Sequence, residues 1–307
     1  MTEQGSSGIS GFTKQRIDVG DVSLSVHRGG RGPALLLIHG YPQNHMCWAG
    51  VAPELSRYFD VIVPDLRGYG ESDAPENDAD NTVYSKRTMA ADLIGVLDAL
   101  GLEQAHVLGH DRGARVTYRM ALDHPARVGR VGIIEVVPTG DFWDSWTADI
   151  ALKAYHWTFL AQPYPLPEKM IGADPEAYID WTLASWTHQK SLVPFSKEAL
   201  AAYRAQAADP ARIHAMCSDY RAGATTDRAH DRADRAAGRK VPHPLHFMYA
   251  QTGFPAQTGD PASLWQAWCD RRVTTSSVPG SGHFVMEEAP QAVLETFVPH
   301  FRKHDPV

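Results

Sequence analysis

The fold of this chain is decided by residues 107–115, which read VLGHDRGAR. An apolar run meets the pattern Gly-x-Asp-x-Gly there, and a segment with apolar residues at helical spacing follows. The pattern is typical of a nucleophile elbow, in which a strand turns sharply into a helix and holds one side chain out at the turn. Glycine on both sides permits a close approach that larger residues would block. Serine is the usual residue at the turn, but Asp111 stands there in this chain.

Strand-like and helix-like segments alternate on both sides of the elbow. Runs dominated by apolar residues at 35–38, 61–63, 131–134 and 245–249 predict strands buried on both faces. Residues 17–26 alternate apolar and polar side chains around a Gly-Asp turn, which predicts an antiparallel hairpin. The sequence therefore predicts an α/β fold with a mostly parallel sheet and helices on both faces.

The character of the sequence changes after Thr139, where tryptophan and tyrosine become frequent and strand-like runs stop. We expect a mostly helical insertion here, which forms a cap over the sheet after its sixth strand. The expected boundaries are 1–138 and 226–307 for the two parts of the core and 139–225 for the cap. Charges of both signs mix over 227–240, which favours a solvated helix or loop.

Composition limits the partners and the location that we expect. The chain has 307 residues, 43% of them hydrophobic and 21% charged, and a net charge of −7. Nucleic acid is not expected as a partner, because phosphate binding calls for a basic face. No membrane span or signal peptide is expected, since no apolar run approaches the roughly 20 residues that cross a bilayer. Three cysteines without C-x-x-C spacing are expected to be reduced thiols in a cytoplasmic protein.

A carboxylate at the elbow suits attack on a saturated carbon. Asp111 is ionised near neutral pH, so it can displace a leaving group directly and form an ester with the protein. Water must then break that ester, and a histidine acting as general base would activate the water. His283, near the end of the chain, is the candidate base in the order nucleophile, acid, histidine. This chemistry needs no metal and no organic cofactor, and the 15 histidines show no H-E-x-x-H spacing.

The base needs an acid that sets its tautomer, and two carboxylates compete for this role. Glu135 directly follows the apolar strand after the elbow helix, where a solvated surface role is hard to explain. Asp260 follows the strand at 245–249, but it lies far along its loop. We favour Glu135 as the acid.

Groups on both sides of the elbow indicate an oxyanion hole and an anionic substrate. The backbone N–H groups of Tyr41 and Arg112 are expected to form the oxyanion hole. Arg112 and Arg115 are three residues apart in the first helical turn, where the helix dipole disfavours cations. They therefore favour a substrate carboxylate held by guanidinium groups. The alternative is that one of them pairs with a nearby carboxylate such as Glu135 or Asp65.

With these residues in view, the chain resembles the α/β-hydrolase superfamily over nearly its whole length, and within it the fluoroacetate (haloacetate) dehalogenases. The motifs that carry the resemblance are His39-Gly40-Tyr41-Pro42-Gln43, residues 109–115, Tyr155-His156-Trp157, Asp219-Tyr220-Arg221-Ala222-Gly223 and Ser281-Gly282-His283-Phe284. The first and last motifs are shared with relatives such as epoxide hydrolases. The arginine pair together with the histidine, tryptophan and tyrosine of the cap is more specific.

The resemblance implies the α/β-hydrolase fold and a role for each of these residues. Asp111 would attack the α-carbon of a haloacetate and expel halide, while Arg112 and Arg115 hold the substrate carboxylate. Three side chains would donate hydrogen bonds to the departing halide, namely His156, Trp157 and Tyr220. They supply an imidazole N–H, an indole N–H and a phenol O–H. The related dehalogenases also indicate a homodimer.

One position departs from the family pattern, since Glu135 stands where the dehalogenases have aspartate. Some haloalkane dehalogenases use glutamate at the corresponding strand end, so the role can survive one extra methylene. Haloalkane dehalogenases carry tryptophan directly after the nucleophile, where this chain has Arg112. That difference favours a charged substrate over a neutral haloalkane.

Three other functions compete with dehalogenation. An epoxide hydrolase would use the same aspartate with two cap tyrosines, Tyr220 and either Tyr155 or Tyr178, but it would leave the arginine pair without a purpose. A serine esterase is disfavoured because the elbow has no hydroxyl. A non-catalytic binding protein is expected to lack part of the triad, whereas all three members have a candidate here.

Overall fold

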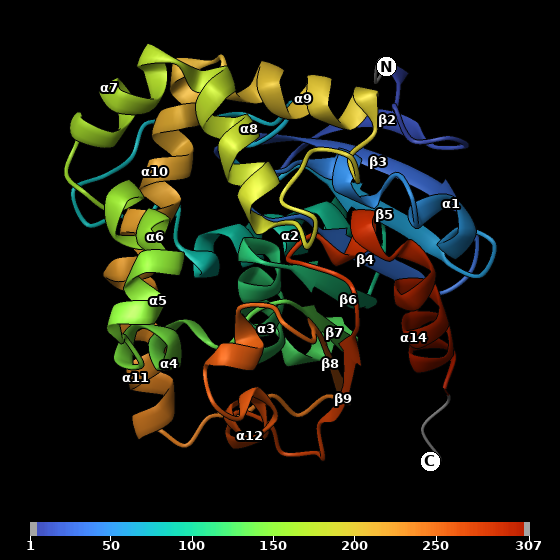
Figure 1. Cartoon of the computed structure of the whole chain (residues 1–307). Coiled ribbons are helices and arrows are strands. Elements are labelled where there is room, and N and C mark those ends of the chain that lie inside the picture. The colour runs from blue at the N-terminus through green and yellow to red at the C-terminus, as the bar shows by residue number, and fades with distance from the viewer. Residues whose placement is uncertain (1–4, 304–307) are drawn as a thin grey trace.

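The protein is described by a computed structural model over residues 5–303, and it is built around one mixed sheet (Figure 1). The strands follow the order β1-β2-β3-β5-β4-β6-β7-β8-β9 across the sheet. The pairs that join β1, β2, β3 and β5 are antiparallel, and the pairs from β5 to β9 are parallel. The strands are β1 Gly5–Ser6, β2 Thr13–Asp18, β3 Ser23–Gly30, β4 Ala34–Ile38, β5 Asp60–Pro64, β6 Ala105–His110, β7 Val128–Ile134, β8 Leu245–Ala250 and β9 Thr274–Val278.

Helices cover both faces of the sheet, because alternate strand residues point to opposite sides. In β4, Leu36 and Ile38 join the core under α2 and α3, whereas Leu35 and Leu37 join the core under α1 and α14. This arrangement confirms the predicted sheet with helices on both faces. The elements of the core are η1 His45–Trp48, α1 Ala52–Leu55, α2 Lys86–Ala99, α3 Arg112–Asp123, η2 Pro125–Arg127, η3 Pro255–Gln257, α12 Pro261–Ala267, α13 Val285–Glu288 and α14 Pro290–Arg302.

A helical segment between β7 and α11, Thr226–Ala236, covers the carboxyl ends of the central strands (Figure 1). Tyr178 of this segment contacts Tyr41 after β4, and Asp219 contacts Tyr69 after β5 and Arg112 after β6. The insertion follows β7, which is the sixth strand when the two-residue β1 is left aside. The helices are α4 Thr139–Asp144, α5 Ala148–Lys153, α6 Tyr155–Leu160, α7 Leu166–Ala173, α8 Pro175–Trp186, α9 Lys197–Ala207 and α10 Pro210–Ala224.

The mixed-charge segment after the cap differs from its prediction. Most of it forms α11, Thr226–Ala236, and three of its aspartates, Asp227, Asp231 and Asp234, are buried on one face. Asp231 and Asp234 both pair with Arg119 of α3. Spacings of four and three residues put these aspartates on one side of a helix, where they neutralise a buried cation of the core. The helix is therefore solvated on one face only.

The division into a core and a cap stays a proposal, with the cap at 139–225 between core parts 1–138 and 226–307. Within the described residues, no helix has the length and apolar character that crossing a membrane requires.

Candidate active site

Asp111 stands at the turn between β6 and α3 with φ 48° and ψ −120°. A positive φ is uncommon for residues other than glycine. A Cβ atom on Gly109 would lie 2.6 Å from the Gly113 carbonyl oxygen, and a Cβ atom on Gly113 would lie 2.2 Å from that of His39. Gly109 is therefore required where β6 packs against the start of α3, and Gly113 is required where the turn packs against the end of β4. The turn projects the Asp111 side chain beyond the carboxyl end of β6.

The loop after β4 lies against the elbow and supplies a hydrogen bond to Asp111. The Tyr41 N–H donates to Asp111 Oδ1 at 2.9 Å. Arg112 is the first residue of α3, so its N–H has no acceptor within that helix. A Cβ atom on Gly40 would lie 2.6 Å from Asp111 Cβ, which shows how closely the two segments approach. Both ring nitrogens of His39 bind backbone groups, so this residue shapes the loop.

His283 lies between two carboxylates. Its Nδ1 is 3.4 Å from Glu135 Oε2, and its Nε2 is 3.6 Å from Asp111 Oδ2. Burial lowers the pKa of His283, but its contacts with Asp111 and Glu135 outweigh burial and raise that pKa to about 9. Burial likewise opposes ionisation of Asp111, but the contact with His283 holds the pKa of Asp111 well below its usual range. At neutral pH an imidazolium therefore lies beside the ionised carboxylate of Asp111.

Glu135 occupies a buried position directly after β7. Its φ is 62°, and its Oε1 accepts a hydrogen bond from the Ala250 N–H. Gly253 leaves room for the long side chain, since a Cβ atom there would lie 2.7 and 2.9 Å from the two carboxylate oxygens. Burial raises the pKa of Glu135. The competing Asp260 is exposed and caps the N-terminus of α12.

Arg112 is fully buried and bound to a carboxylate of the cap. Its Nε lies 3.2 Å from both carboxylate oxygens of Asp219, and its Nη2 lies 2.6 Å from Asp219 Oδ1. Asp219 also pairs with Lys86. The sequence left open that one of the two arginines pairs with a carboxylate such as Glu135 or Asp65. Arg112 does pair with a carboxylate, but its partner is Asp219 of α10. Only Nη1 of this guanidinium is buried without a partner among the described residues.

Arg115 has no carboxylate partner within residues 5–303. Its Nη1 donates to the Val137 carbonyl at 3.0 Å and to the Thr139 hydroxyl at 2.9 Å. Its Nε is buried without a partner in the same part of the chain. Burial, and then the charge of Arg112, lower the pKa of Arg115. An anion beside Arg115 would favour its charged form and so offset both of these influences on its pKa.

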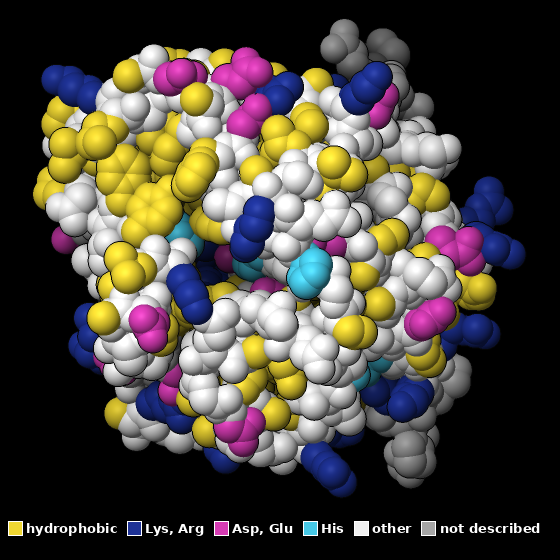
Figure 2. All heavy atoms as spheres, in the orientation of Figure 1, with side chains coloured by type: hydrophobic (Ala, Val, Ile, Leu, Met, Phe, Trp, Pro, Cys, Tyr) yellow, Lys and Arg dark blue, Asp and Glu magenta, His cyan; other side chains and the backbone are white. Residues whose placement is uncertain are grey.

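A cavity of about 510 Å³ opens between the cap and the elbow. Asp111, Arg115, Glu135 and His283 line it together with aromatic side chains, namely Tyr155, Trp157, Trp181, Trp186 and Phe254. Figure 2 shows a hollow on this face, with hydrophobic side chains gathered beside it over the cap and basic side chains near its rim. The cavity therefore brings the buried guanidinium of Arg115 and the Asp111 carboxylate together beside aromatic side chains.

Three cap side chains with polar hydrogens meet near this cavity. His156 and Trp157 line it, and the Tyr220 ring lies 5.7 Å from the His156 ring and 5.8 Å from the Trp157 ring between centroids. Tyr220 Oη is buried without a partner among the described residues. Burial raises the pKa of Tyr220 well above its usual value and lowers the pKa of His156 to about 3. All three side chains are therefore neutral near pH 7 and keep a hydrogen to donate.

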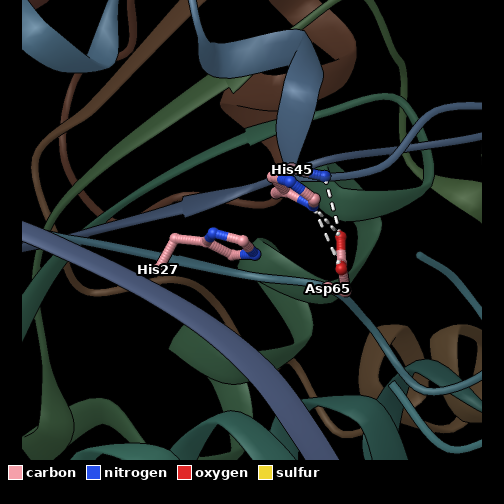
Figure 3. Close-up of side chains that lie close together, drawn as sticks. All are labelled: His27, His45 and Asp65. Atoms are coloured by element: carbon pink, nitrogen blue, oxygen red, sulfur yellow. Dashed lines mark hydrogen bonds and ion pairs between the residues drawn. The ribbon is translucent and has the colours of Figure 1, made fainter. Parts of the chain in front are cut away.

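A second polar cluster, formed by His27, His45 and Asp65, lies outside the cavity lining (Figure 3). The two imidazole rings stack with centroids 3.7 Å apart. His45 binds Asp65 through its backbone N–H and its Nδ1, and the hydroxyls of Ser7 and Ser25 bind the two ring nitrogens of His27. The ring nitrogens and carboxylate oxygens named here are atoms that could bind a metal ion, but each already has a hydrogen-bond partner. We therefore explain the cluster as buried polar packing and assign no ion to it.

Several residues that support the site were not assigned a role from the sequence. Asp219 lay within a motif of the resemblance, and its position next to Tyr220 is a signal that could have identified it. Gly253 makes room for the Glu135 carboxylate, and nothing in its local sequence indicates this. Glu287 accepts a hydrogen bond from Gln43, and thereby anchors the loop that carries Tyr41.

The sequence of this chain is similar to those of known proteins. Residues 33–290 match the family model of the α/β hydrolase fold. A fluoroacetate dehalogenase from a Burkholderia species is 41% identical over 282 residues, which cover 92% of this chain and 91% of that protein. A soluble epoxide hydrolase from a Corynebacterium species is 32% identical over 273 residues, which cover 89% and 91%.

A solved structure is also similar to this chain in its three-dimensional fold. The crystal structure of ALR0039 from Nostoc sp PCC 7120 matches with a TM-score of 0.92 at 39% identity, and the match covers 95% of this chain and 99% of that one. The chain therefore belongs to the α/β-hydrolase family, and it is similar over most of its length to both a fluoroacetate dehalogenase and an epoxide hydrolase.

Proposed function

We propose that this hydrolase removes the halogen from short 2-haloacids, with fluoroacetate or another haloacetate as substrate and glycolate as product. In the first step, Asp111 Oδ2 attacks the α-carbon, the carbon–halogen bond breaks, and the halide leaves with the bonding electrons. Asp111 Oδ1, which already accepts the Tyr41 N–H, becomes the carbonyl oxygen of the ester. No cofactor or metal takes part in this scheme.

The proposal is carried by one observation, the buried charge of Arg115 beside the nucleophile without a carboxylate partner in residues 5–303. A substrate carboxylate there would neutralise Arg115 and accept charge-assisted hydrogen bonds from it. Arg112 adds a donor through its Nη1. Because Asp219 already balances the charge of Arg112, Arg115 would supply most of the attraction.

The departing halide would be bound by His156, Trp157 and Tyr220. Fluoride is a poor leaving group, so its departure needs several donors already aimed at the place where negative charge develops. The three side chains are neutral, which lets them donate hydrogen bonds without holding a free anion as strongly as a cation would. Bound halide can then leave the cavity after turnover.

In the second step, water attacks the ester carbonyl carbon of Asp111 while His283 Nε2 takes a proton from it. The N–H groups of Tyr41 and Arg112 stabilise the oxyanion on Oδ1. Collapse of this intermediate expels the glycolate oxygen, which receives the proton from His283. Glu135 orients His283 and stabilises its charged form throughout.

A single turnover of excess enzyme with fluoroacetate in oxygen-18 water tests the proposal. We expect free fluoride and one labelled oxygen in the peptide that carries Asp111, because water attacks the enzyme ester. His283→Asn should release fluoride and retain an ester that mass spectrometry detects, and Asp111→Asn should release none. Fluoride without label in the peptide would mean that water attacks the substrate carbon directly. The absence of halide release from fluoroacetate and from other haloacetates with the wild-type enzyme would contradict the proposed substrate class.

Epoxide hydrolysis is the alternative, and one observation favours it. The Tyr220 hydroxyl is buried without a partner among the described residues, as an acid toward an epoxide oxygen would be. The second tyrosine is less suitable, because Tyr178 Oη is bound to Tyr41 Oη at 3.1 Å. Tyr155 lines the cavity but is 36% exposed. An epoxide also leaves the charge of Arg115 unbalanced. Label in Asp111 after an epoxide, with no fluoride from fluoroacetate, would establish this alternative.

We also propose a cytoplasmic homodimer. The three cysteines are buried thiols, which suits a reducing compartment. Exposed apolar side chains gather on the cap helices, as a surface covered by a second copy would show (Figure 2).

A further inference from the structure

The carboxylate of Glu288, the last residue of α13, holds the loop that carries His283. Its Oε2 accepts the Gly282 N–H at 2.9 Å, and its Oε1 accepts the Phe284 N–H at 3.1 Å. These two N–H groups lie on either side of His283 in the chain. Oε2 also accepts the N–H of His188, in the cap loop after α8, at 2.7 Å. A single side chain therefore binds both flanks of the proposed base and the cap above it.

The cap loop lies directly on the loop of the base. The Trp186 carbonyl accepts the His283 N–H at 2.9 Å. A Cβ atom on Gly282 would lie 2.5 Å from both the His188 nitrogen and the Trp186 carbonyl oxygen. The two loops are thus in contact at the backbone, and Glu288 joins them on one side.

The side-chain contacts of His283 are long by comparison. Its ring nitrogens lie 3.4 Å from Glu135 and 3.6 Å from Asp111, whereas well-formed hydrogen bonds of this kind are about 2.7–3.2 Å long. These two contacts therefore restrain the ring weakly, and its position depends on how firmly the backbone is held. Glu288 provides two of the backbone bonds next to His283.

We propose that Glu288 is a positioning residue that sets His283 for the attack of water on the ester and couples this alignment to the cap. The inference rests on the proposed function, in which His283 is the base of the second step only. Asp111 expels halide without help from a base, so loss of Glu288 should slow ester hydrolysis and spare halide release. A role in stability alone would change the amount of folded enzyme but not the ratio of the two rate constants.

Glu288→Gln is the test variant, because it keeps the shape of the side chain but has one acceptor oxygen in place of two. Whichever way the amide turns, its NH₂ group faces the N–H of either Gly282 or Phe284, so one flank of His283 loses its acceptor. Glu295→Gln is the matched control, since Glu295 is exposed on α14 and binds only Gln291 among described side chains. Rapid-quench measurements with fluoroacetate would follow halide and protein ester separately.

We expect Glu288→Gln to release halide within about twofold of the wild-type rate constant, and its ester hydrolysis to slow by about tenfold to a hundredfold. Ester should therefore accumulate in this variant and not in Glu295→Gln. The burst of halide counts competent sites, so partial misfolding does not alter the comparison. Unchanged hydrolysis, or an equal fall in both rate constants, would overturn the positioning role. A wild-type enzyme that forms neither halide nor ester would overturn the proposed function itself.

Discussion

At the scale of single residues, the proton on His283 connects the two proposed steps. Ester formation removes the charge of Asp111, one of the two carboxylates that raise the pKa of His283. The pKa of His283 in the ester should therefore lie below the value of about 9 that it has in the resting site, because burial lowers it and only Glu135 still raises it. Because the neutral ring is the base, ester hydrolysis should speed up as pH rises through that pKa and then level off.

Halide release should show a different pH dependence. The pKa of Asp111 lies well below its usual range, so the nucleophile stays ionised from about pH 5 upward and its rate constant should be flat. Single-turnover rate constants for the two steps, measured from about pH 5 to about pH 9, check both expectations. Ester hydrolysis that slows as pH rises through the neutral range would contradict the role of His283.

The two arginines after the nucleophile should differ in their effects. Arg115→Met removes a buried cation that has no carboxylate partner in the described residues, so unfolding should not become easier. The substrate carboxylate would lose one or two charge-assisted hydrogen bonds, each worth about 1.5–3 kcal/mol, and KM for a haloacetate should rise at least tenfold. Steady-state kinetics with a haloacetate and with a neutral epoxide would show whether the loss is specific to the anion.

Arg112→Leu should act mainly on stability. It leaves Asp219 buried with Lys86 as its remaining ion-pair partner, and breaking a buried pair in this way costs about 3–5 kcal/mol. Urea denaturation of both variants measures the difference. A greater loss of stability for Arg115→Met than for Arg112→Leu would contradict the assignment of Asp219 as the partner that balances Arg112.

At the scale of elements, the ends of β7 and β8 together determine where the proposed acid lies. Glu135 leaves β7 with a positive φ, and the loop after β8 offers it the Ala250 N–H and the open side of Gly253. A glutamate fits here because that loop has a glycine at the point of contact. The extra methylene relative to aspartate is therefore accommodated by the neighbouring element.

Gly253→Ala tests this fit. The new methyl group would lie 2.7 Å from Glu135 Oε1, so the carboxylate must move and ester hydrolysis should slow by about tenfold. The double variant Gly253→Ala with Glu135→Asp shortens the acid and should recover part of the loss. Rate constants for ester hydrolysis in the single and double variants measure the coupling. The steric explanation would be contradicted if the rate constant for ester hydrolysis in the double variant fell below the value expected from multiplying the two single effects.

At the scale of the whole molecule, the cap presents an apolar surface that the proposed homodimer would cover. Leu166 and Met170 of α7 are 51% and 60% exposed, and their spacing of four residues puts them on one face of the helix. Trp181 of α8 is 66% exposed. Figure 2 shows hydrophobic side chains gathered over this part of the cap.

We expect light scattering after size exclusion to give about twice the chain mass of 33.8 kDa. Replacing both Leu166 and Met170 by glutamate should yield a monomer, because charges would be buried in the interface. Lys240→Glu, an exposed change on the core, should leave the dimer intact. A monomeric wild-type protein, or a dimer that survives the double replacement, would contradict this interface.

The fold could be predicted from local patterns because it depends on them. Apolar runs identify strands that must be buried on both faces, and the glycines around Asp111 identify a turn that larger residues cannot form. Once the strands are parallel, their carboxyl ends share an edge, so Asp111, Glu135 and His283 were expected to meet. The structure brings these three side chains together. Their catalytic roles are still a proposal that turnover must test.

The partners of the buried charges were decided only by tertiary packing. Asp219 binds Arg112 across 107 residues, and Glu288 binds the cap at His188 across 100 residues. The buried face of α11 and the space beside Gly253 arise in the same way. Which carboxylate neutralises a cation, or which N–H groups a carboxylate accepts, depends on the segment that packs over it, and the residues next to it in the chain carry little of that information. Local sequence therefore specified the elbow and the sheet, whereas the packing of the cap onto the core selected the contacts that surround Asp111 and His283.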